Sequence, residues 1–361
     1  MTQQSPLARR LAAQIAAAGP MGVPEFMTAC LHDPQHGYYA TRPALGAEGD
    51  FITAPLISQM FGELIGLWLV ETWRGLGRPA WFRLVEAGPG DGTLIGDVLR
   101  AARVDPAFLA AADLWLVETS APLRQAQAQR LAGAALAPRW ATNLDEVPAG
   151  APLLLVANEL LDCLPARPLV RTAQGWAEQV VGLDEDGALA FGLRPCAPGE
   201  APAAEAPVGL VVEVSPAQAA FVETLATRIR QDGGAGLLID YGRARPEPGE
   251  TLQALQRHRK VDPLATAGES DLTVHADFPA VLAAARAAGC AASLLTQGDF
   301  LRRLGIEARA AALARARPDA AERLARQLAR LTHDDQMGAL FKAACLYRPG
   351  DPVPPAFESA S

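Results

Sequence analysis

The sequence has few cysteines, and their positions do not favour pairing. Among its 361 residues there are five, an odd number, which lie far apart and form no CxxC pair: Cys30, Cys163, Cys196, Cys290 and Cys345. This pattern favours neither a disulfide framework nor a zinc ribbon. A reducing compartment fits it best.

The sequence also lacks an excess of positive charge and a long apolar run. It has 32 basic and 40 acidic residues, which gives a formal net charge of -8, whereas proteins that bind nucleic-acid backbones carry a basic excess. No apolar stretch approaches the roughly 20 residues that a membrane-spanning helix needs. We therefore expect no nucleic-acid partner and no membrane insertion.

What the sequence does have is enough apolar residues for a large core. Half of its residues are hydrophobic and 20% are charged, which is typical of a chain that buries one large core or two smaller ones. Residues 5–18 carry Arg9 and Arg10 but no cleavage pattern, so they resemble an amphipathic helix more than a secretory signal. The wealth of Ala, Arg and Leu and the scarcity of Lys suggest a bacterial cytoplasmic protein.

From residue 82 onward, strand patterns alternate with helical ones. The expected strands are short and mostly apolar: 82–86, 114–118, 139–142, 153–157, 236–241, 291–296 and 340–347. Such alternation predicts a parallel sheet with helical crossovers. Two alternating segments around 184–187 predict an antiparallel hairpin inserted in this pattern. Upstream, residues 5–31 and 58–76 have mainly helical spacing.

A glycine-rich turn between the first of these strands and the next helix is the strongest local signal. Residues 86–93 read EAGPGDGT. The glycines, Gly88, Gly90 and Gly92, allow a tight turn and a close approach of a ligand to the backbone. GxGxG after the acidic Glu86 differs from the dinucleotide fingerprint GxGxxG, and it is associated with S-adenosylmethionine in Rossmann-like methyltransferases. A purely structural turn is the alternative.

Further polar residues follow later strands. Glu118 ends the second strand, where a carboxylate can accept hydrogen bonds from both ribose hydroxyls, while Glu86 could hold the methionine ammonium group. Asn158, Glu159 and Asp162 come immediately after the fourth strand. Since ligands of open parallel sheets lie beyond the carboxyl ends of the strands, we expect the reaction site there. A helix start stabilised by early acids is the alternative.

Eight segments together resemble the MidA family and cover nearly the whole chain in the same order. They are GDFITAP (49–55), SQMFGE (58–63), EAGPGDGTL (86–94), NELLDCLP (158–165), LIDYG (238–242), DLTVHADF (271–278), TQGDFLRRLGI (296–306) and QMGALFK (336–342). This family comprises S-adenosylmethionine-dependent methyltransferases, including the mitochondrial arginine methyltransferase needed for assembly of respiratory complex I.

The resemblance implies a fold, a cofactor and a partner. The fold would be α/β, a Rossmann-like class I methyltransferase with a mostly parallel seven-stranded sheet, an N-terminal helical segment and an inserted β-hairpin and helical subdomain. Residues 1–78 would form the N-terminal lid segment and residues 79–361 the core, with insertions at about 163–208 and 243–290. The cofactor would be S-adenosylmethionine, the substrate a protein arginine, such as one in a complex I subunit, and a homodimer is the oligomeric state to test.

The expected site residues fall into three groups. For catalysis, Glu159 would orient the guanidinium group and Asp162 would be a second clamp or a support. The cofactor-binding candidates are Glu86, Gly88, Gly90, Gly92, Thr93, Glu118, Asn158, Phe51, Thr53 and Glu63; the loop that holds Phe51 and Thr53, together with Glu63, is either a lid or a core anchor. The substrate-binding candidates are Asp271, His275 and Asp277, with a structural hydrogen-bonding role as the alternative for the histidine.

No metal is expected, and several positions depart from the family pattern, among them Leu56, Asp91, the segment NELLDCLP (158–165) and Ala276. His32 and His36 are four residues apart, but Pro34 disfavours the helix that would align them. Leu56 stands where an acid is common, which could change the acceptor or weaken activity, and Asp91 stands where arginine is common. Leu56 and Asp91 leave open a non-catalytic assembly or binding protein with this fold. A nicotinamide oxidoreductase is a further alternative, which the GxGxG spacing disfavours.

Overall fold

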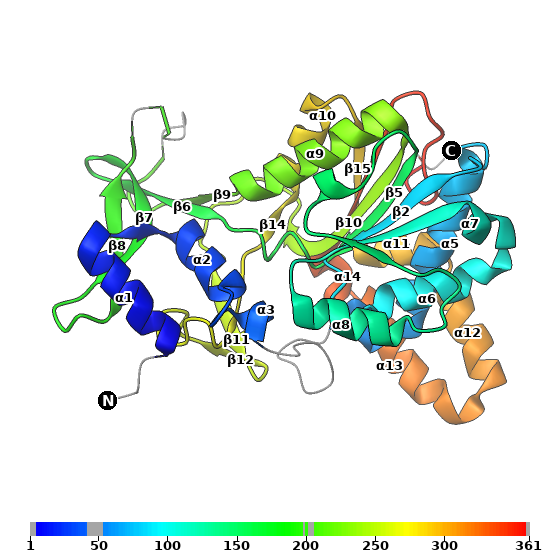
Figure 1. Cartoon of the computed structure of the whole chain (residues 1–361), viewed down its shortest axis with the longest axis horizontal. Helices are drawn as coiled ribbons and strands as arrows, with labels where there is room; N and C mark the ends of the chain where they lie inside the picture. Colours follow the sequence, from blue (N-terminus) through cyan, green and yellow to red (C-terminus); the bar gives the residue numbers. More distant parts are fainter. Residues whose placement is uncertain (1–4, 42–52, 198, 201–205, 359–361) are drawn as a thin grey trace.

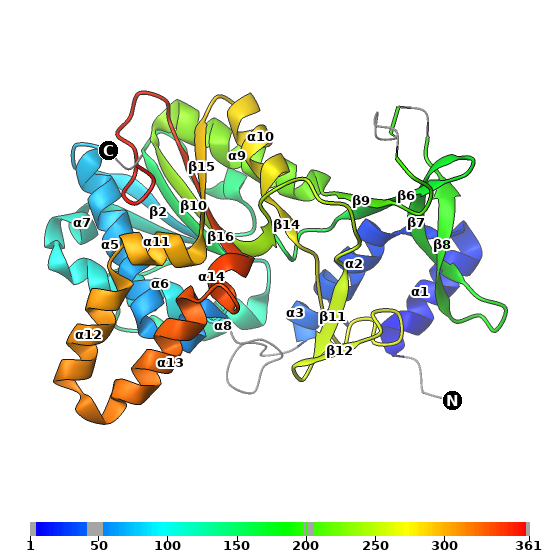
Figure 2. The ribbon, with the colours of Figure 1, turned by 180° about the vertical axis from the view of Figure 1, so that it is seen from behind.

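The chain folds into two lobes (Figure 1), a larger one around a central sheet and a smaller one that contains the N-terminal helices. This computed structural model describes residues 5–41, 53–197, 199–200 and 206–358. Seen from behind, the helices α12 (Ile306–Ala316) and α13 (Ala321–Thr332) project together from the larger lobe (Figure 2).

The central sheet has eight strands and mixed direction. In the order β15–β16–β10–β5–β2–β3–β4, with β14 beside β10, the five strands from β10 to β4 run parallel, and β16 is antiparallel to both of its neighbours. The strands are β2 (Phe82–Ala87), β3 (Ala112–Val117), β4 (Arg139–Ala141), β5 (Leu153–Asn158), β10 (Gly234–Arg243), β14 (Ala276–Asp277), β15 (Ala291–Thr296) and β16 (Phe341–Tyr347). The predicted α/β fold is confirmed; the sheet itself is mixed and includes the short strand β14.

The strand β5 at the middle of this sheet is buried on both faces because its sequence is apolar up to Asn158. Successive side chains of a strand point to opposite faces. Leu154 and Val156 therefore pack on one side, and Leu153 and Leu155 pack on the other. A strand covered on both faces reads as a continuous apolar run, as β5 does.

Helices cover both faces of the sheet. One face packs against α5 (Gln59–Gly75), α6 (Thr93–Ala101), α7 (Pro106–Ala111), α11 (Gln297–Arg303), α12 and α13, and the other against α9 (Pro216–Asp232) and α10 (Phe278–Ala287). The remaining helices of this lobe are α4 (Ala54–Ile57), α8 (Ala121–Arg130) and α14 (Met337–Leu340), with short 3-10 turns at Ala102–Val104, Leu144–Glu146 and Pro318–Ala320. Among the described residues, no helix combines the length and the apolar character that a membrane crossing requires.

The smaller lobe joins the N-terminal helices to two insertions in the larger lobe. Its elements are α1 (Pro6–Ala18), β1 (Met21–Gly22), α2 (Val23–His32), α3 (Tyr38–Thr41), β6 (Arg167–Thr172), β7 (Gly175–Leu183), β8 (Leu189–Pro195), β9 (Val211–Val214), β11 (Gln253–Gln256), β12 (Arg259–Val261) and β13 (Asp271–Thr273). The strands β7 and β8 pair antiparallel, as the sequence predicts. Leu11 of α1, Phe26 of α2, Val181 of β7 and Leu272 of β13 share one apolar core.

We expect Leu155→Ala to destabilise the larger lobe strongly, because Leu155 is 0% exposed at the centre of the sheet. Truncating such a side chain removes apolar burial and leaves a cavity, at a cost of about 2–5 kcal/mol in the free energy of unfolding. Leu193→Ala is the matched control, since Leu193 of β8 is 53% exposed. Urea denaturation followed by circular dichroism measures both; equal shifts of the two midpoints would contradict this account.

Candidate functional site

The glycine-rich turn joins β2 to α6 with its glycines in left-handed backbone conformations. Gly88 has φ +67° and Gly92, which precedes the first residue of α6, has φ +82°. A Cβ atom on Gly88 would lie 3.0 Å from the Cδ1 atom of Leu160. The amide of Thr93 donates to the carboxylate of Asp91 at 2.9 Å, which fixes the start of the helix. The turn therefore needs glycine both for its backbone angles and for space.

A cavity of about 380 Å³ lies beyond the carboxyl ends of β2, β3 and β5. Its volume is in the range of small-molecule sites. Ten of the residues predicted for the site line it: Thr53, Glu86, Gly88, Gly90, Thr93, Glu118, Asn158, Glu159, Asp162 and Asp271. The structure thus brings the ends of three strands and parts of both lobes to one cavity.

Glu86, the penultimate residue of β2, is an acid buried without a full set of partners. Burial, with Asp91 and Glu118 nearby, raises the pKa of its carboxyl group to about 8. Within the described part of the chain, its Oε2 atom has no hydrogen-bond partner, and neither has the hydroxyl of Thr93. Unpaired buried polar atoms in a cavity wall are costly unless a ligand binds them. A cationic group with N–H donors fits this position.

Glu118 directly follows β3 and is oriented by its own neighbours. Its Oε1 atom accepts from the Ser120 amide at 2.8 Å and its Oε2 atom from the Gln127 side chain at 3.3 Å. Burial raises the pKa of this carboxyl group above its ordinary value, against these hydrogen bonds, which lower it. The result is a fixed carboxylate at the end of the strand next to β2, where ribose hydroxyls can donate to it.

The loop after β5 presents two further acids to the cavity. Glu159 has φ +54°, which is rare outside glycine, and its Oε1 atom accepts from Asn158 Nδ2 at 2.9 Å and from the Ala54 amide at 3.2 Å. Burial, with Asp162 nearby, raises the pKa of the Glu159 carboxyl group to about 7. Burial also raises the pKa of Asp162, whose Oδ1 atom has no hydrogen-bond partner in the described chain.

Asp240 in β10 holds this loop and was not predicted as a site residue. Its Oδ2 atom accepts from the amides of Leu161 at 2.8 Å and Asp162 at 3.1 Å. Burial, with the charges of Asp162 and Glu159, raises the pKa of its carboxyl group well above the ordinary value. The sequence signal that could have identified Asp240 is a single acid inside an otherwise apolar strand, because packing of the strand does not require an acid there. Tyr39, which also lines the cavity, was missed as well.

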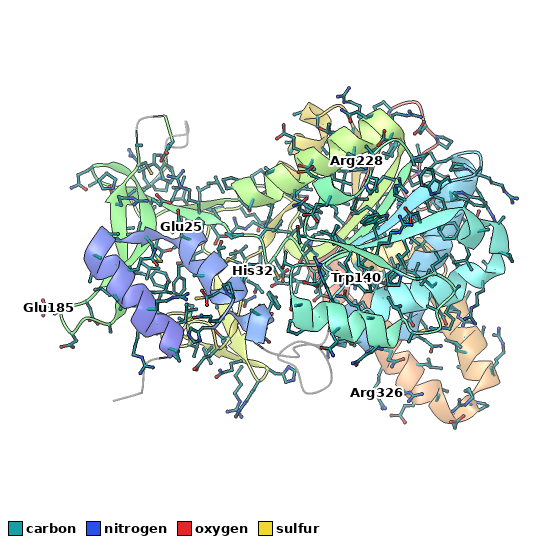
Figure 3. All side chains as sticks on the ribbon, viewed as in Figure 1. Glu25, His32, Trp140, Glu185, Arg228 and Arg326 are labelled. Atoms are coloured by element: carbon teal, nitrogen blue, oxygen red, sulfur yellow. The ribbon has the colours of Figure 1, made fainter. Side chains whose placement is uncertain are left out.

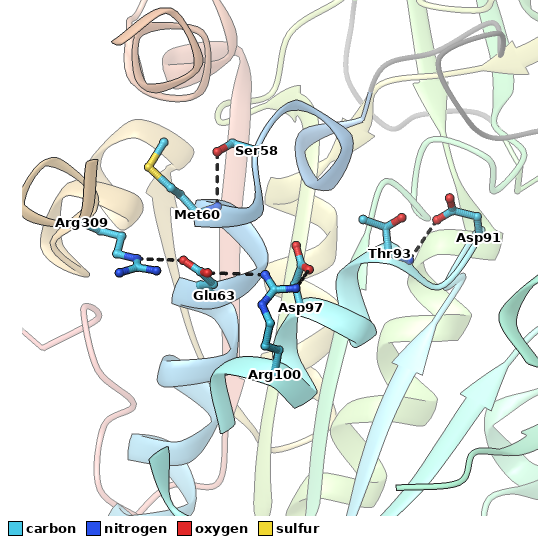
Figure 4. A network of polar contacts seen from close by, with 8 residues as sticks. All are labelled: Ser58, Met60, Glu63, Asp91, Thr93, Asp97, Arg100 and Arg309. Atoms are coloured by element: carbon cyan, nitrogen blue, oxygen red, sulfur yellow. Dashed lines mark hydrogen bonds and ion pairs between the residues drawn. The ribbon is translucent and has the colours of Figure 1, made fainter. Parts of the chain in front are cut away.

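Glu63 lies in a separate polar network rather than at the cavity (Figure 4). Its carboxylate accepts from the Arg309 Nε atom at 2.9 Å and from Arg100 at 3.5 Å, and Arg100 also binds Asp97 at 2.6 Å. These contacts tie α5 to α6 and α12. Glu63 is therefore engaged by cations of the protein itself, and the structure does not place it among the residues that line the cavity.

Three other predicted residues also lie outside the described lining. His275 packs its ring edge-on against Tyr241, with 5.5 Å between ring centroids, and Asp277 accepts from the Ala280 amide at 3.1 Å as the cap of α10. Gly92 shapes the turn but does not line the cavity. Phe51 falls outside the described residues.

The histidines considered for a metal lie on different local structures. His32, labelled between the two lobes in Figure 3, is the last residue of α2 and lines the cavity, whereas His36 lies beyond that helix. Burial lowers the pKa of His32. The ring of His32 lies 5.8 Å from that of Tyr39, centroid to centroid.

Leu56 and Asp91, which depart from the family pattern, both lie at the cavity. Leu56 lines it on α4, so that part of the wall is apolar. Asp91 also lines it, and its carboxylate accepts from Arg130 of α8 at 2.6 Å. The negative charge of Asp91 is therefore paired at the rim, where the pair ties the glycine-rich turn to α8.

Comparison with known proteins agrees with this geometry. Residues 64–296 match a family model described as "Putative S-adenosyl-L-methionine-dependent methyltransferase". The chain is 37% identical over 376 residues to the mitochondrial protein arginine methyltransferase NDUFAF7 homolog of Drosophila melanogaster, covering 94% of this chain and 84% of that protein. It is 36% identical over 330 residues to human mitochondrial protein arginine methyltransferase NDUFAF7, covering 84% and 74%.

Solved structures from Burkholderia thailandensis share the fold over almost the whole chain. One native structure has a TM-score of 0.84 at 30% identity and covers 98% of this chain and 94% of its own. Another, bound to S-adenosyl-homocysteine, has a TM-score of 0.82 at 29% identity and covers 98% and 93%.

The mitochondrial names of the curated relatives contradict the bacterial cytoplasmic location expected from composition, and that expectation is withdrawn. Amino-acid composition follows the coding bias of a genome and does not indicate where in the cell a protein is located. Family membership, by contrast, follows from the family match and from the sequence identity to these relatives. The chain belongs to this family of S-adenosyl-L-methionine-dependent methyltransferases, in agreement with the resemblance of its motifs to the MidA family, and S-adenosylmethionine is its cofactor.

Proposed function

We propose that this methyltransferase transfers the methyl group of S-adenosylmethionine to an arginine side chain of a protein. The observation that carries the proposal is the set of acidic side chains that line the cavity. Six acids line it, Glu86, Asp91, Glu118, Glu159, Asp162 and Asp271, and the described lining contains no lysine or arginine. Such a cavity suits a cationic cofactor and a cationic acceptor. The curated relatives are named protein arginine methyltransferases, which supports the same acceptor.

At the cofactor end, we assign Glu86 to the amino-acid part of the cofactor and Glu118 to the ribose. The unpaired Oε2 atom of Glu86 supports the first assignment, and the fixed carboxylate of Glu118 at the end of β3 supports the second. Gly88 and Gly90 line the cavity, and because they have no side chains the cofactor can approach the backbone there. When bound, the cofactor supplies an electrophilic methyl group on a sulfonium centre.

At the acceptor end, Glu159 would orient the guanidinium group and Asp162 would be the second clamp. A guanidinium ion has five N–H donors and no available lone pair, so carboxylates must align it and one must accept the proton released on transfer. The pKa of Glu159, raised by burial to about 7, suits proton acceptance near neutral pH. Asn158 and the amide of Ala54 fix the carboxylate in place.

Several finer expectations stay predictions. The resemblance seen in the sequence implies a subunit of respiratory complex I as the client and leaves a homodimer to be tested. We also propose the division into residues 1–78 as an N-terminal segment and residues 79–361 as the core, with insertions at about 163–208 and 243–290. Packing of α1 and α2 on β7 supports that division, whereas packing of α5 on α6 joins the end of the first segment to the core.

Glu159→Gln should keep cofactor binding and lose transfer. The amide has nearly the same shape but neither clamps a cation by charge nor accepts the proton, so we expect transfer to fall by about 100-fold or more while the affinity for S-adenosylmethionine changes less than about threefold. Transfer of labelled methyl groups into protein extract measures the first, and calorimetry measures the second. The matched control is Glu223→Gln, on an exposed position of α9.

Two results of this experiment separate the competing functions. Wild-type transfer to arginine, lost in the Glu159→Gln protein, supports the proposal. Cofactor binding without transfer by the wild type would instead support the non-catalytic assembly protein.

Glu86→Gln should flatten the pH dependence of stability in the ligand-free protein. The pKa of this carboxyl group is about 8 in the folded chain and about 4.3 in an unfolded one. Between these values the folded state holds a proton that the unfolded state has lost, so Glu86 lowers the free energy of unfolding as pH rises. Glutamine removes that contribution. Melting temperatures at pH 5.5 and 8.5 measure the effect.

The same variant should bind S-adenosylmethionine more weakly, by about tenfold or more, because it loses a charged hydrogen-bond acceptor. Calorimetry at pH 8.5 checks this loss. A variant that lost as much stability as the wild type between the two pH values, and bound the cofactor equally well, would contradict the role of Glu86.

A further inference from the structure

Three segments from distant parts of the chain meet at the acceptor end of the cavity. Tyr39 comes from α3, Cys163 from the loop after β5, and Asp271 from β13. The Tyr39 hydroxyl lies 2.9 Å from Asp271 Oδ1 and 3.0 Å from Cys163 Sγ. All three residues line the cavity.

The direction of these hydrogen bonds follows from the groups. The Tyr39 hydroxyl has one hydrogen and donates it to the carboxylate of Asp271. The Cys163 thiol is therefore the donor to the phenolic oxygen. Burial raises the pKa of both the Tyr39 hydroxyl and the Cys163 thiol well above their ordinary values, so both groups keep their hydrogens at neutral pH.

The position of Tyr39 is fixed from the backbone and from the ring. Its carbonyl oxygen accepts from the Ser120 hydroxyl at 2.8 Å, and Ser120 donates its amide to Glu118. Its ring packs edge-on against Tyr38 at 5.2 Å and lies against His32. Contacts with both lobes therefore hold the hydroxyl in place.

The backbone of Asp271 is fixed by a different set of contacts. It pairs with Leu255 in the sheet of β11 and β13, and the nearby Val274 amide donates to the Asp162 carbonyl at 2.9 Å. The strand that carries Asp271 is thus docked on the loop that carries Asp162. The hydrogen bond from the Tyr39 hydroxyl restricts rotation of the Asp271 carboxylate about its side-chain bonds.

We propose that Tyr39 is a positioning residue for the methyl acceptor, because its hydroxyl holds the Asp271 carboxylate toward the guanidinium group of the incoming arginine. The inference rests on the proposed function. Asp271 then faces the acceptor from the smaller lobe, while Glu159 and Asp162 face it from the loop after β5. A planar guanidinium ion has donors along three edges, so carboxylates brought from two lobes can bind it together.

Tyr39→Phe tests this role because it removes the hydroxyl and keeps the ring. With acetyl-Gly-Arg-Gly-amide as the probe, we expect the KM to rise about tenfold, the size expected when a hydrogen bond to a charged group is lost, with kcat changed less than about threefold. The affinity for S-adenosyl-homocysteine should change less than about twofold. Tyr347→Phe is the matched control, because Tyr347 ends β16 and pairs with Ala235 at the opposite end of β10.

A double-mutant cycle separates positioning from a general structural effect. Asp271→Asn should also raise the KM, and adding Tyr39→Phe to it should change the KM less than about twofold, because the hydroxyl acts through the carboxylate. If the KM of the double variant rose by the product of the two single-variant increases, the proposal would be overturned. A loss of S-adenosyl-homocysteine affinity equal to the loss of peptide affinity would also overturn it.

The wild-type protein tells the two levels of inference apart. Calorimetry with saturating S-adenosyl-homocysteine should show binding of the arginine peptide and not of acetyl-Gly-Lys-Gly-amide. Absence of this preference would overturn the proposed function, and with it the role of Tyr39. If the wild type shows the preference and the Tyr39→Phe protein binds the arginine peptide equally well, only the role of Tyr39 is overturned.

Discussion

The site depends on the burial of carboxyl groups where parallel strands end. Glu86 and Asp240 lie near the carboxyl ends of β2 and β10, and Glu118 and Glu159 follow β3 and β5 directly. Burial raises the pKa of each of these four groups. Charging them without a cation nearby is unfavourable in a medium of low polarity. The sheet topology thus favours positive charge at this edge of the sheet, and both the cofactor and the proposed arginine acceptor are positively charged.

The two lobes contribute differently to this site. The larger lobe supplies the glycine-rich turn, Glu86 and Glu118, to which we assign the cofactor, together with the loop that carries Glu159. The smaller lobe supplies Tyr39 and Asp271, which are 232 residues apart in the chain and meet only because the N-terminal helices pack on the second insertion. The sheet therefore positions the residues assigned to the cofactor, whereas the proposed acceptor contacts depend on packing between the lobes.

The sequence predicted the features that follow from local patterns. The apolar run of β5 and the glycines after β2 indicate their own structure, and the rule that ligands lie beyond strand ends then locates Glu86, Glu118 and Glu159. Helical spacing predicted α5 but could not show that Glu63 would reach Arg100 and Arg309, since those partners come from other helices. The contact of Tyr39 with Asp271, and the hold of Asp240 on its loop, likewise depend on tertiary packing that no periodicity encodes.

The place of β16 in the sheet has a consequence for synthesis. This strand lies between β10 and β15, yet residues 341–347 follow every other strand of the sheet in the sequence. Until they leave the ribosome, one edge of β10 has no backbone partner, and an apolar unpaired edge invites association with other chains. The nascent protein must therefore keep that edge from pairing with other chains, and its central sheet is completed late rather than extended steadily from the N-terminal side.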